Sequence, residues 1–306
     1  MQQALARGDS LEQPVRLLLS GNTGSGKTTE INKLCFEAGS RFRIIAIHTN
    51  RLPQLFRMSM ADAVFMMAAA WRAADETEPA HDALRQDIHE YFSDDIFAGN
   101  IRLLGRDDTL GGLVRVEFDA RYLSRSEQWI QRQRAARRRL PNVVATLNHI
   151  LSQMRAADRR PALFIFDDTD KIALPDAESI FLAHGHELAG VTASVVYTLA
   201  SGVWHSPRFA AARAWSTAQY HLDDLRDSMD DVESVGWRNL DEVIARRADA
   251  ALFAPDARRA ILHDCQGRLG RLIELAHYAA VNALGRGAAR IELVDADRAS
   301  AWFHQY

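Results

Sequence analysis

The chain has little lysine. Only three of its 37 basic residues are lysines, at Lys27, Lys33 and Lys171, and the others are arginines. A composition rich in alanine and arginine is typical of a GC-rich genome, so the bias by itself indicates no function. Against this background the lysines are informative, because Lys27 and Lys171 lie inside the two motifs described below.

Cysteine and long apolar runs are also scarce. The two cysteines, Cys35 and Cys265, have no CxxC spacing, so we expect neither a disulfide framework nor a zinc site. The most apolar run, Met58 to Trp71, contains Asp62 and is shorter than the roughly 20 residues that a membrane span needs. The first residues lack the basic-then-apolar pattern of a signal peptide. We therefore expect a cytoplasmic protein with no membrane segment.

The net charge of −3 is small, so nucleic-acid binding would need a local basic patch. The only concentrated basic run is Gln131 to Arg139. On a helix its arginines would spread over more than one face, as on a solvated helix. The alternative is that Arg132 to Arg139 contact the phosphates of DNA. The rest of residues 75–160 suggests no function.

Apolar runs alternate with segments of helical spacing over the first 225 residues, which predicts a parallel α/β sheet. After residue 225 the pattern is helical only. We expect a parallel α/β core at about 1–225, with a helical insertion at about 75–160, and a separate α-helical lid at 226–306. The expected strands are 15–20, 42–48, 113–118, 162–166, 192–199 and 220–222, and residues 99–112 are expected to be a glycine-rich connection. The expected helices are 27–38, 58–74, 81–92, 124–157 and 177–186 in the core and 240–251, 256–264, 270–284 and 294–303 in the lid.

The first expected strand leads into a complete GxxxxGK(S/T) phosphate-binding loop, or P-loop. Residues 21–28 read GNTGSGKT, and the motif has the strand before it and the helix after it that it requires. Glycines let successive backbone N–H groups point at phosphates, and the helix N-terminus favours the anion further. We expect Lys27 to reach the β- and γ-phosphates and the Thr28 hydroxyl to bind Mg²⁺. The expected nucleotide-binding residues are Gly21, Asn22, Thr23, Gly24, Ser25, Gly26, Lys27, Thr28 and Thr29.

A second, acidic motif follows the apolar run Ala162–Phe166 and reads Asp-Asp-Thr-Asp-Lys at 167–171. A P-loop needs a carboxylate at the end of a neighbouring strand to hold magnesium. We expect Asp167 to bind Mg²⁺ and Asp168 to polarise the attacking water. Many such ATPases carry glutamate, which is one methylene longer, at the second position. A structural subunit that binds nucleotide with little hydrolysis is therefore an open alternative.

Further catalytic groups are expected after this motif. Thr198 stands near the end of the strand expected at 192–199 and is the candidate for a polar group near the γ-phosphate. Hydrolysis also needs a positive charge there in the transition state. Arg208 is the first candidate because it follows a turn-like Ser-Pro pair, and Arg213, Arg246 and Arg247 are alternatives.

Other kinds of site have little support. The run His184-Gly185-His186 has no third ligand at a spacing that suggests a metal. Ser201 and Ser206 lack the context of a nucleophile elbow. The only Asn-Lys pair, Asn32-Lys33, lies in the wrong place for the motif with which GTPases read guanine, which favours ATP over GTP.

On these motifs the chain resembles bacterial P-loop ATPases of the AAA+/STAND group. The similar segments are LLLSGNTGSGKTTEINKL, FIFDDTDKI, VVYTL and GRLGRLIEL, which begins at Gly267. The resemblance extends from about residue 14 to 300; it is strong at the two motifs and diffuse over 50–160. It implies a RecA-like parallel-sheet P-loop NTPase core with a C-terminal α-helical lid domain, and ATP and Mg²⁺ as cofactors. Members of this group often belong to conflict or antiphage systems.

The lid carries one departure from the pattern. In the family it usually has an arginine three residues after the first glycine, and here that position is Gly270. Arg268 and Arg271 flank it, and the resemblance implies that one of them contacts the nucleotide. The lid is also similar to that of initiator and transposition-regulator AAA+ ATPases.

The resemblance and the motifs together predict an ATP-hydrolysing switch or assembly factor in an antiphage system. Because the chain shows no nuclease, protease or membrane effector of its own, we expect a homo-oligomer that acts on a separate effector protein. The alternative is a DNA-binding initiator- or transposition-type AAA+ ATPase.

Overall fold

The structure is a computed structural model that describes residues 1, 3–6, 13–49, 58–74, 101–107, 113–118, 138, 140–153, 160–225 and 234–305. The chain divides into two compact units. The first consists of residues 1–20 and 27–221, and the second of residues 21–26 and 222–306. The loop before Lys27 therefore packs with C-terminal residues. The insertion expected at about 75–160 is described only in part, so the expected domain assignment stays a prediction.

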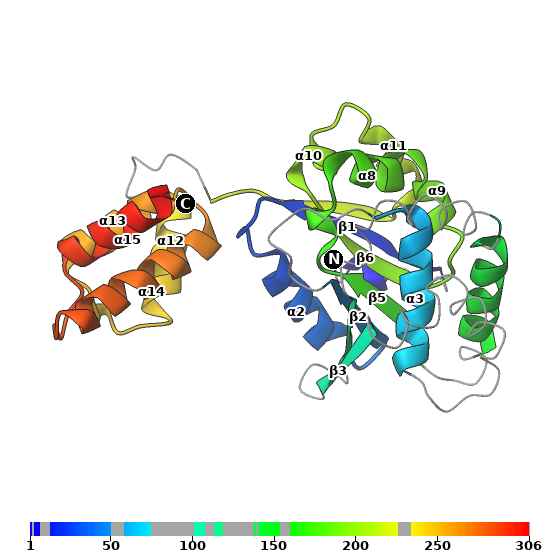
Figure 1. The fold of residues 1–306 in the computed structure, drawn as a ribbon, viewed down its shortest axis with the longest axis horizontal. Coiled ribbons are helices and arrows are strands. Elements are labelled where there is room, and N and C mark those ends of the chain that lie inside the picture. The colour runs from blue at the N-terminus through cyan, green and yellow to red at the C-terminus, as the bar shows by residue number, and fades with distance from the viewer. Residues whose placement is uncertain are drawn as a thin grey trace. The chain divides into compact units, whose positions relative to one another are not determined.

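Within the described residues, a seven-stranded sheet forms the centre of the first unit, in the order β3-β4-β2-β5-β6-β1-β7 (Figure 1). The pairs β4–β2, β2–β5, β5–β6 and β6–β1 are parallel, and β3 is antiparallel to β4. The parallel α/β fold class is thereby confirmed. The strands are β1 (Arg16–Gly21), β2 (Arg43–Thr49), β3 (Ile101–Asp107), β4 (Leu113–Phe118), β5 (Ala162–Phe166), β6 (Ser194–Leu199) and β7 (Ala218–Leu222).

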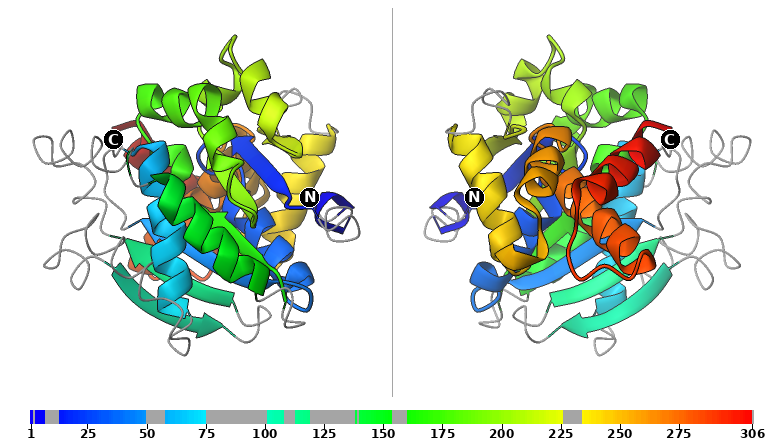
Figure 2. Two further views of the ribbon diagram at one scale, coloured as in Figure 1. Left: turned by 90° about the vertical axis from the view of Figure 1, so that its right-hand side faces the viewer. Right: turned by 90° about the vertical axis from the view of Figure 1, so that its left-hand side faces the viewer.

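Helices cover both faces of this sheet. Figures 1 and 2 show α3 (Met60–Ala74) and the helix over 140–153 on one face and α2 (Lys27–Ala38) on the other. Every residue from Met60 to Trp71 is buried, and a helix that is apolar on all sides belongs inside a core. Strand residues alternate between the two faces. One set, which includes Ile45, Phe164 and Val195, shares a core with α3.

The segment after β5 differs from the single helix expected over 177–186. It contains the 3₁₀ turn Thr169–Lys171, α8 (Leu174–Glu178), a π-helical turn at Ser179–Ala183 and α9 (Gly185–Leu188). Trp215, which ends α11 (Ala210–Trp215), donates a hydrogen bond from Nε1 to the carbonyl of Phe181 at 2.9 Å. A Cβ at Gly185 would lie 2.0 Å from the same indole nitrogen. The tryptophan therefore leaves room only for glycine at position 185, where α9 begins.

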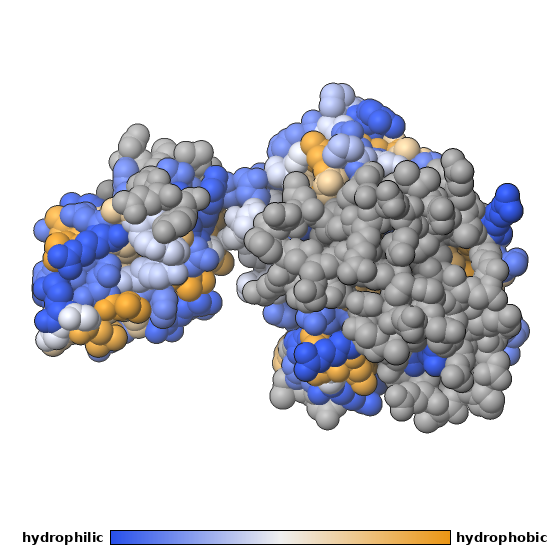
Figure 3. Space-filling view, in the orientation of Figure 1, coloured by the Kyte–Doolittle hydropathy of each residue, from blue (hydrophilic) through white to orange (hydrophobic). Residues whose placement is uncertain are grey.

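The second unit is helical, as expected. Its helices are α12 (Val235–Ala245), α13 (Pro255–Asp264), α14 (Leu269–Gly285) and α15 (Leu293–Gln305), with a 3₁₀ turn at Ala250–Leu252. They bury their own apolar core, which includes Leu240, Ile261 and Leu275. Apolar side chains also reach its surface in several separate places (Figure 3). Within the described ranges, no helix has both the length and the apolar character to cross a bilayer.

Asp295 is a fully buried carboxylate in the first turn of α15. It accepts hydrogen bonds from Arg286 Nε and Nη2 at 2.8 and 2.5 Å and from the backbone N–H of Glu292 at 3.0 Å. The hydrogen bonds from Arg286 lower the pKa of Asp295, and the bond from Glu292 acts in the same direction. Because the pKa is lower in the folded state, the carboxylate stabilises the fold above its unfolded pKa of about 3.9, and this stabilisation is lost as the pH falls.

We expect Asp295→Asn to lower the melting temperature at pH 7 and to lower it progressively less as the pH falls from 5 to 2, because protonation of the wild-type carboxyl then removes the same charge. Circular dichroism melts over this pH range measure the effect. Asp297→Asn, which changes an exposed aspartate on the same helix, is the control and should leave the melting temperature nearly unchanged. An equal loss in Asp295→Asn at every pH would contradict the prediction.

Candidate functional site

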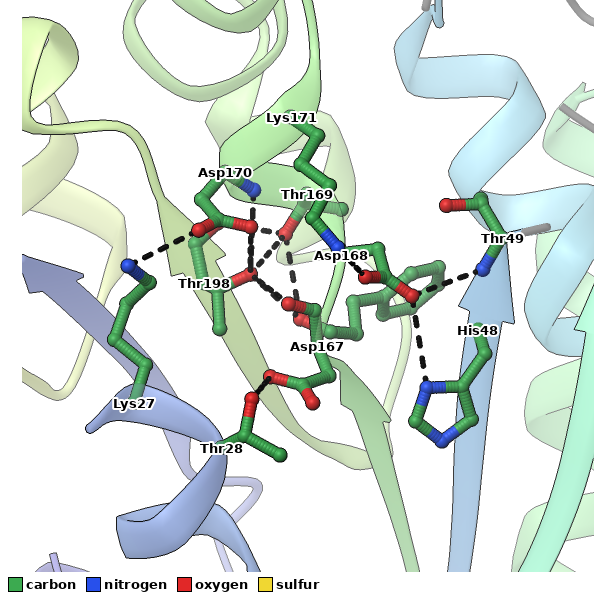
Figure 4. A network of polar contacts seen from close by, with 11 residues as sticks. Lys27, Thr28, His48, Thr49, Asp167, Asp168, Thr169, Asp170, Lys171 and Thr198 are labelled. Atoms are coloured by element: carbon green, nitrogen blue, oxygen red, sulfur yellow. Dashed lines mark hydrogen bonds and ion pairs between the residues drawn. The ribbon is translucent and has the colours of Figure 1, made fainter. Parts of the chain in front are cut away.

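Three neighbouring strands bring the acidic motif together with the ends of β2 and β6. Phe166, the last residue of β5, is in register with Ile47 of β2 and Tyr197 of β6. The residues that follow on all three strands therefore lie at one edge of the sheet. Figure 4 shows the resulting network of polar contacts, which also includes the first residues of α2.

Asp168 has both carboxylate oxygens engaged. Its Oδ2 accepts the backbone N–H of Thr49 at 3.1 Å and lies 3.5 Å from His48 Nδ1. Its Oδ1 is paired with Lys171 Nζ. Burial opposes ionisation of Asp168, but the hydrogen bonds from His48, Lys171 and Thr49 outweigh it and lower its pKa to about 2. Asp168 is thus a charged anchor between β2 and the acidic motif.

Asp167 faces the start of α2. The Thr28 hydroxyl donates to Asp167 Oδ1 at 3.3 Å. Burial and the neighbouring charge of Asp168 both raise the pKa of Asp167. A buried carboxylate beside a second carboxylate favours a cation as its partner.

Asp170 contacts the lysine of the P-loop motif. Lys27 Nζ lies 3.0 Å from Asp170 Oδ2, and only 7% and 14% of the two side chains are exposed. Asp170 and His48 were not among the residues expected at the site. Asp170 lies in the 3₁₀ turn Thr169–Lys171, three residues after Asp167, and that spacing is the signal that could have identified it.

Thr198, on β6, is hydrogen-bonded to the backbone of the acidic motif. Its side chain is fully buried. The hydroxyl donates to the carbonyl of Asp167 at 2.8 Å and accepts the backbone N–H of Asp170 at 3.2 Å. Thr169 in turn donates to the carbonyl of Thr198 at 2.6 Å. The threonine therefore fixes the backbone that carries the acidic side chains, and its contact with a γ-phosphate stays a prediction.

The glycine-rich loop, residues 21–26, belongs to the second unit and forms a turn with an internal hydrogen bond. The Ser25 N–H donates to the Asn22 carbonyl at 3.1 Å. Gly24 and Gly26 have φ angles of +81° and +99°, which glycine adopts readily and other residues do not. Ser25 Oγ is buried and has no hydrogen-bond partner among the described residues. Such an orphaned hydroxyl fits an oxygen-rich ligand at the loop.

The loop contacts the start of α14 through glycine. The Gly270 N–H donates to the Gly24 carbonyl at 2.9 Å, and a Cβ at position 270 would lie 2.9 Å from the Gly24 Cα. The absence of a side chain at this position, where the resemblance implies an arginine, permits the contact. Asn22 Nδ2 also donates to Asp224 Oδ2 at 2.9 Å.

The two lid arginines have different surroundings. Arg268 Nε lies 3.7 Å from Asp224 Oδ2. The Arg271 guanidinium lies over the ring of Phe303 at 5.9 Å, and its Nε and Nη2 are buried with no hydrogen-bond partner in the described part of the chain. Arg268 Nε is likewise buried with no hydrogen-bond partner among the described residues, so which of the two arginines contacts a nucleotide stays a prediction.

The remaining expected residues are less engaged. Thr23 and Thr29 are exposed, as is Arg208, which precedes α11. Of the basic segment 132–139 only residue 138 is described, so the expected DNA contact lies largely outside the described residues. In the described ranges no group of three or more metal-ligating side chains occurs.

These donors fit a magnesium–nucleotide complex. A hydroxyl and a carboxylate oxygen 3.3 Å apart are the hard oxygen ligands that Mg²⁺ prefers, and Mg²⁺ usually takes one or two protein ligands together with substrate phosphates and water. Lys27 supplies an ammonium group beside them.

No protein-family model and no curated protein matches the sequence. Solved structures do match. ORC2 of Aeropyrum pernix, in complexes with ADPNP and ADP, has a TM-score of 0.50 at 12% identity, over 98% of this chain and 65% of that chain. Cdc6p of Pyrobaculum aerophilum has a TM-score of 0.48 at 12% identity, over 95% of this chain and 62% of that chain. ORC1 of A. pernix, in complex with DNA, has a TM-score of 0.48 at 14% identity, over 99% and 63%.

The chain thus spans less than two thirds of the length of these proteins. The likeness to ORC2 shows the fold. The chain has the expected fold, a RecA-like parallel-sheet core with a C-terminal helical unit.

Proposed function

We propose that the protein is a Mg²⁺-dependent ATPase of the AAA+ type. The observation that carries the proposal is the group formed by Lys27, Thr28 and Asp167, in which the last two residues of a complete P-loop sequence meet carboxylates from the segment after β5. The lysine is buried beside a carboxylate, and the threonine hydroxyl is hydrogen-bonded to the aspartate. A phosphate-binding ammonium group and two magnesium ligands are the parts that P-loop hydrolysis requires.

In the proposed mechanism the protein mainly binds the nucleotide and Mg²⁺ and orients the attacking water. Backbone N–H groups of residues 21–26 hold the phosphates, and Lys27 neutralises the β- and γ-phosphates. Thr28 and Asp167 hold Mg²⁺, which when bound neutralises charge that develops on the phosphates during transfer. Two carboxylates are available to orient the attacking water. Asp168 is the one expected from the sequence, and Asp170 is the one beside Lys27.

The test is direct binding of ATP, measured by calorimetry with Mg²⁺ and again with the metal chelated. We expect Thr28→Ala to raise the Mg²⁺ concentration needed for half-maximal hydrolysis by about tenfold, because a metal ligand is lost. Asn32→Ala is the matched control, because Asn32 is an exposed residue one turn further along the same helix. Failure of the wild-type protein to bind ATP at millimolar concentration with Mg²⁺ would rule out the proposed function.

The site is proposed to be completed between subunits of a homo-oligomer. Arg208 is exposed at the start of α11, where it can reach a second copy and stabilise the transition state. The ATPase rate per subunit is then expected to rise with protein concentration in the wild type and to stay flat in Arg208→Ala. A wild-type rate that does not depend on concentration would contradict a shared site.

For the biological role we propose a switch that acts on a separate effector protein in an antiphage system, which rests on the resemblance of the motifs. Loss of protection in a Lys27→Ala strain tests this role, and unchanged protection would count against it.

The second candidate is a DNA-binding initiator- or transposition-type ATPase, which the basic run from Arg132 to Arg139 supports. Salt-dependent DNA binding that disappears when these arginines become alanine would favour it. No binding at low salt in the presence of ATP would exclude it. A nucleotide-binding subunit that hydrolyses little would bind ATP in the first experiment and show no turnover at any protein concentration.

A further inference from the structure

The two carboxylates that could act on water have opposite surroundings. Asp168 is occupied on both oxygens, by the backbone N–H of Thr49 and His48 Nδ1 on one and by Lys171 on the other. A water molecule bound by Asp168 would have to compete with these donors. Two of them come from β2, so to free Asp168 would also disturb the attachment of the acidic motif to the sheet.

Asp170 is placed where the phosphates are expected. Lys27 Nζ is the group that reaches the β- and γ-phosphates in a P-loop, and Asp170 Oδ2 lies 3.0 Å from it. The other oxygen, Oδ1, has one long contact, at 3.5 Å from the Thr198 hydroxyl. The carboxylate is 14% exposed, so one side remains open to water. Figure 4 shows Asp170 directed toward Lys27 and Asp168 directed away from it, toward His48 and Thr49.

The backbone of Asp170 is held firmly. Its N–H donates to the Thr198 hydroxyl at 3.2 Å, and the same hydroxyl donates to the Asp167 carbonyl at 2.8 Å. The magnesium ligand and Asp170 are therefore positioned by one buried side chain. A water-orienting group needs this kind of fixed relation to the metal ligand.

We propose that Asp170 is the catalytic carboxylate of this ATPase and that Asp168 is a positioning residue. The proposal rests on the proposed function and refines it. Asp170 accepts a hydrogen bond from the attacking water. The water oxygen forms a bond to the γ-phosphorus, and the bond from that phosphorus to the bridging oxygen of the β-phosphate breaks. ADP leaves, and the proton of the water passes through Asp170 to the released phosphate.

The same geometry makes Asp170 a competitor of the nucleotide. Asp170 contacts Lys27, the group that the phosphates are expected to contact, so carboxylate and phosphates would share the ammonium group. The negative charge of Asp170 also opposes the γ-phosphate, which ADP lacks. Removal of this charge is therefore expected to strengthen binding of ATP more than binding of ADP.

The experiment compares Asp170→Asn with Asp168→Asn in the full chain, using fluorescent ATP and ADP analogues for affinity, phosphate release for hydrolysis and thermal melts for folding. Asp170→Asn is expected to lower the hydrolysis rate by about 100-fold or more and to tighten ATP binding by about tenfold, with a smaller change for ADP. Asp168→Asn is expected to lower the melting temperature, because it weakens the attachment of the acidic motif to β2, and to slow hydrolysis clearly less than Asp170→Asn does.

The outcomes separate this proposal from the proposed function. If the wild type binds no nucleotide, the proposed function fails. If the wild type binds and hydrolyses ATP while Asp170→Asn does both unchanged, or if folded Asp168→Asn alone loses hydrolysis, the proposed function stands and the assignment to Asp170 is overturned. If the wild type binds ATP without turnover, tighter ATP binding in Asp170→Asn supports the assignment and unchanged binding overturns it. Should Asp170→Asn fail to fold, Asp170→Ser, which is smaller and neutral, carries the same expectations.

Discussion

Lys27→Ala is expected to lower the affinity for ATP by about 100-fold, because a charge-assisted contact with the phosphates is worth about 3 kcal/mol. The lysine side chain is only 7% exposed and lies beside Asp170. Little conformational entropy is therefore lost when it contacts the phosphates. Binding of a fluorescent ATP analogue measures the effect. Hydrolysis at saturating ATP should fall as well, since the same charge stabilises the transferred phosphate.

The sequence offers a matched control for this change. Lys33→Ala removes the other lysine of helix α2. Because Lys33 is exposed, the affinity for ATP should stay within about twofold of wild type. Lys27→Arg keeps the charge and tests whether the compact ammonium group is needed. ATP affinity that is unchanged in a folded Lys27→Ala protein would show that the loop does not bind the triphosphate.

Much of the fold follows from local patterns. The apolar run Ala162–Phe166 is wholly buried and forms β5 with the expected ends. Helix α2 begins at Lys27 and ends at Ala38, as its apolar spacing predicts. Such elements are predictable because one residue pattern determines both their secondary structure and their burial.

The strand β3 was not predicted, and the reason is physical. Its sequence IRLLGRD lies in the stretch expected to be a glycine-rich connection. It is an edge strand, antiparallel to β4, with a bulge between Leu103 and Gly105. Both Leu103 and Leu104 are exposed. A strand without a regular buried face shows no alternation of apolar and polar residues in its sequence. Its hydrogen bonds to β4 identify β3 as a strand.

Only part of the site was predictable from the sequence, because some of its residues are contiguous in the chain and others are not. Residues contiguous in a motif, such as Lys27 and Thr28, carry their spacing in the sequence. The partners of Asp168 from β2, His48 and Thr49, lie more than a hundred residues away along the chain. Only the parallel pairing of β2 with β5 brings them together. The roles of Asp168 and Asp170 therefore depend on tertiary contacts that no local pattern contains.

Thr198→Val is expected to lower the melting temperature by about 5 °C, which corresponds to a loss of about 2 kcal/mol. Valine keeps the volume of the fully buried side chain but leaves the Asp167 carbonyl and the Asp170 N–H without their shared partner. The loop that carries both carboxylates would then shift. We therefore expect a lower affinity for Mg²⁺ and slower hydrolysis along with the lower stability. Thermal melts measure the stability, and Mg²⁺ titration of the ATPase rate measures the affinity.

Thr198→Ser separates the hydroxyl from the methyl group. Serine keeps the hydrogen bonds and loses one methyl, so its melting temperature should lie between those of the wild type and Thr198→Val, at a cost of about 1 kcal/mol. Hydrolysis and Mg²⁺ affinity should stay near wild type in the serine variant. If instead Thr198→Val melts like the wild type and loses only its preference for ATP over ADP, the hydroxyl contacts the γ-phosphate, and the acidic loop is held by its other contacts.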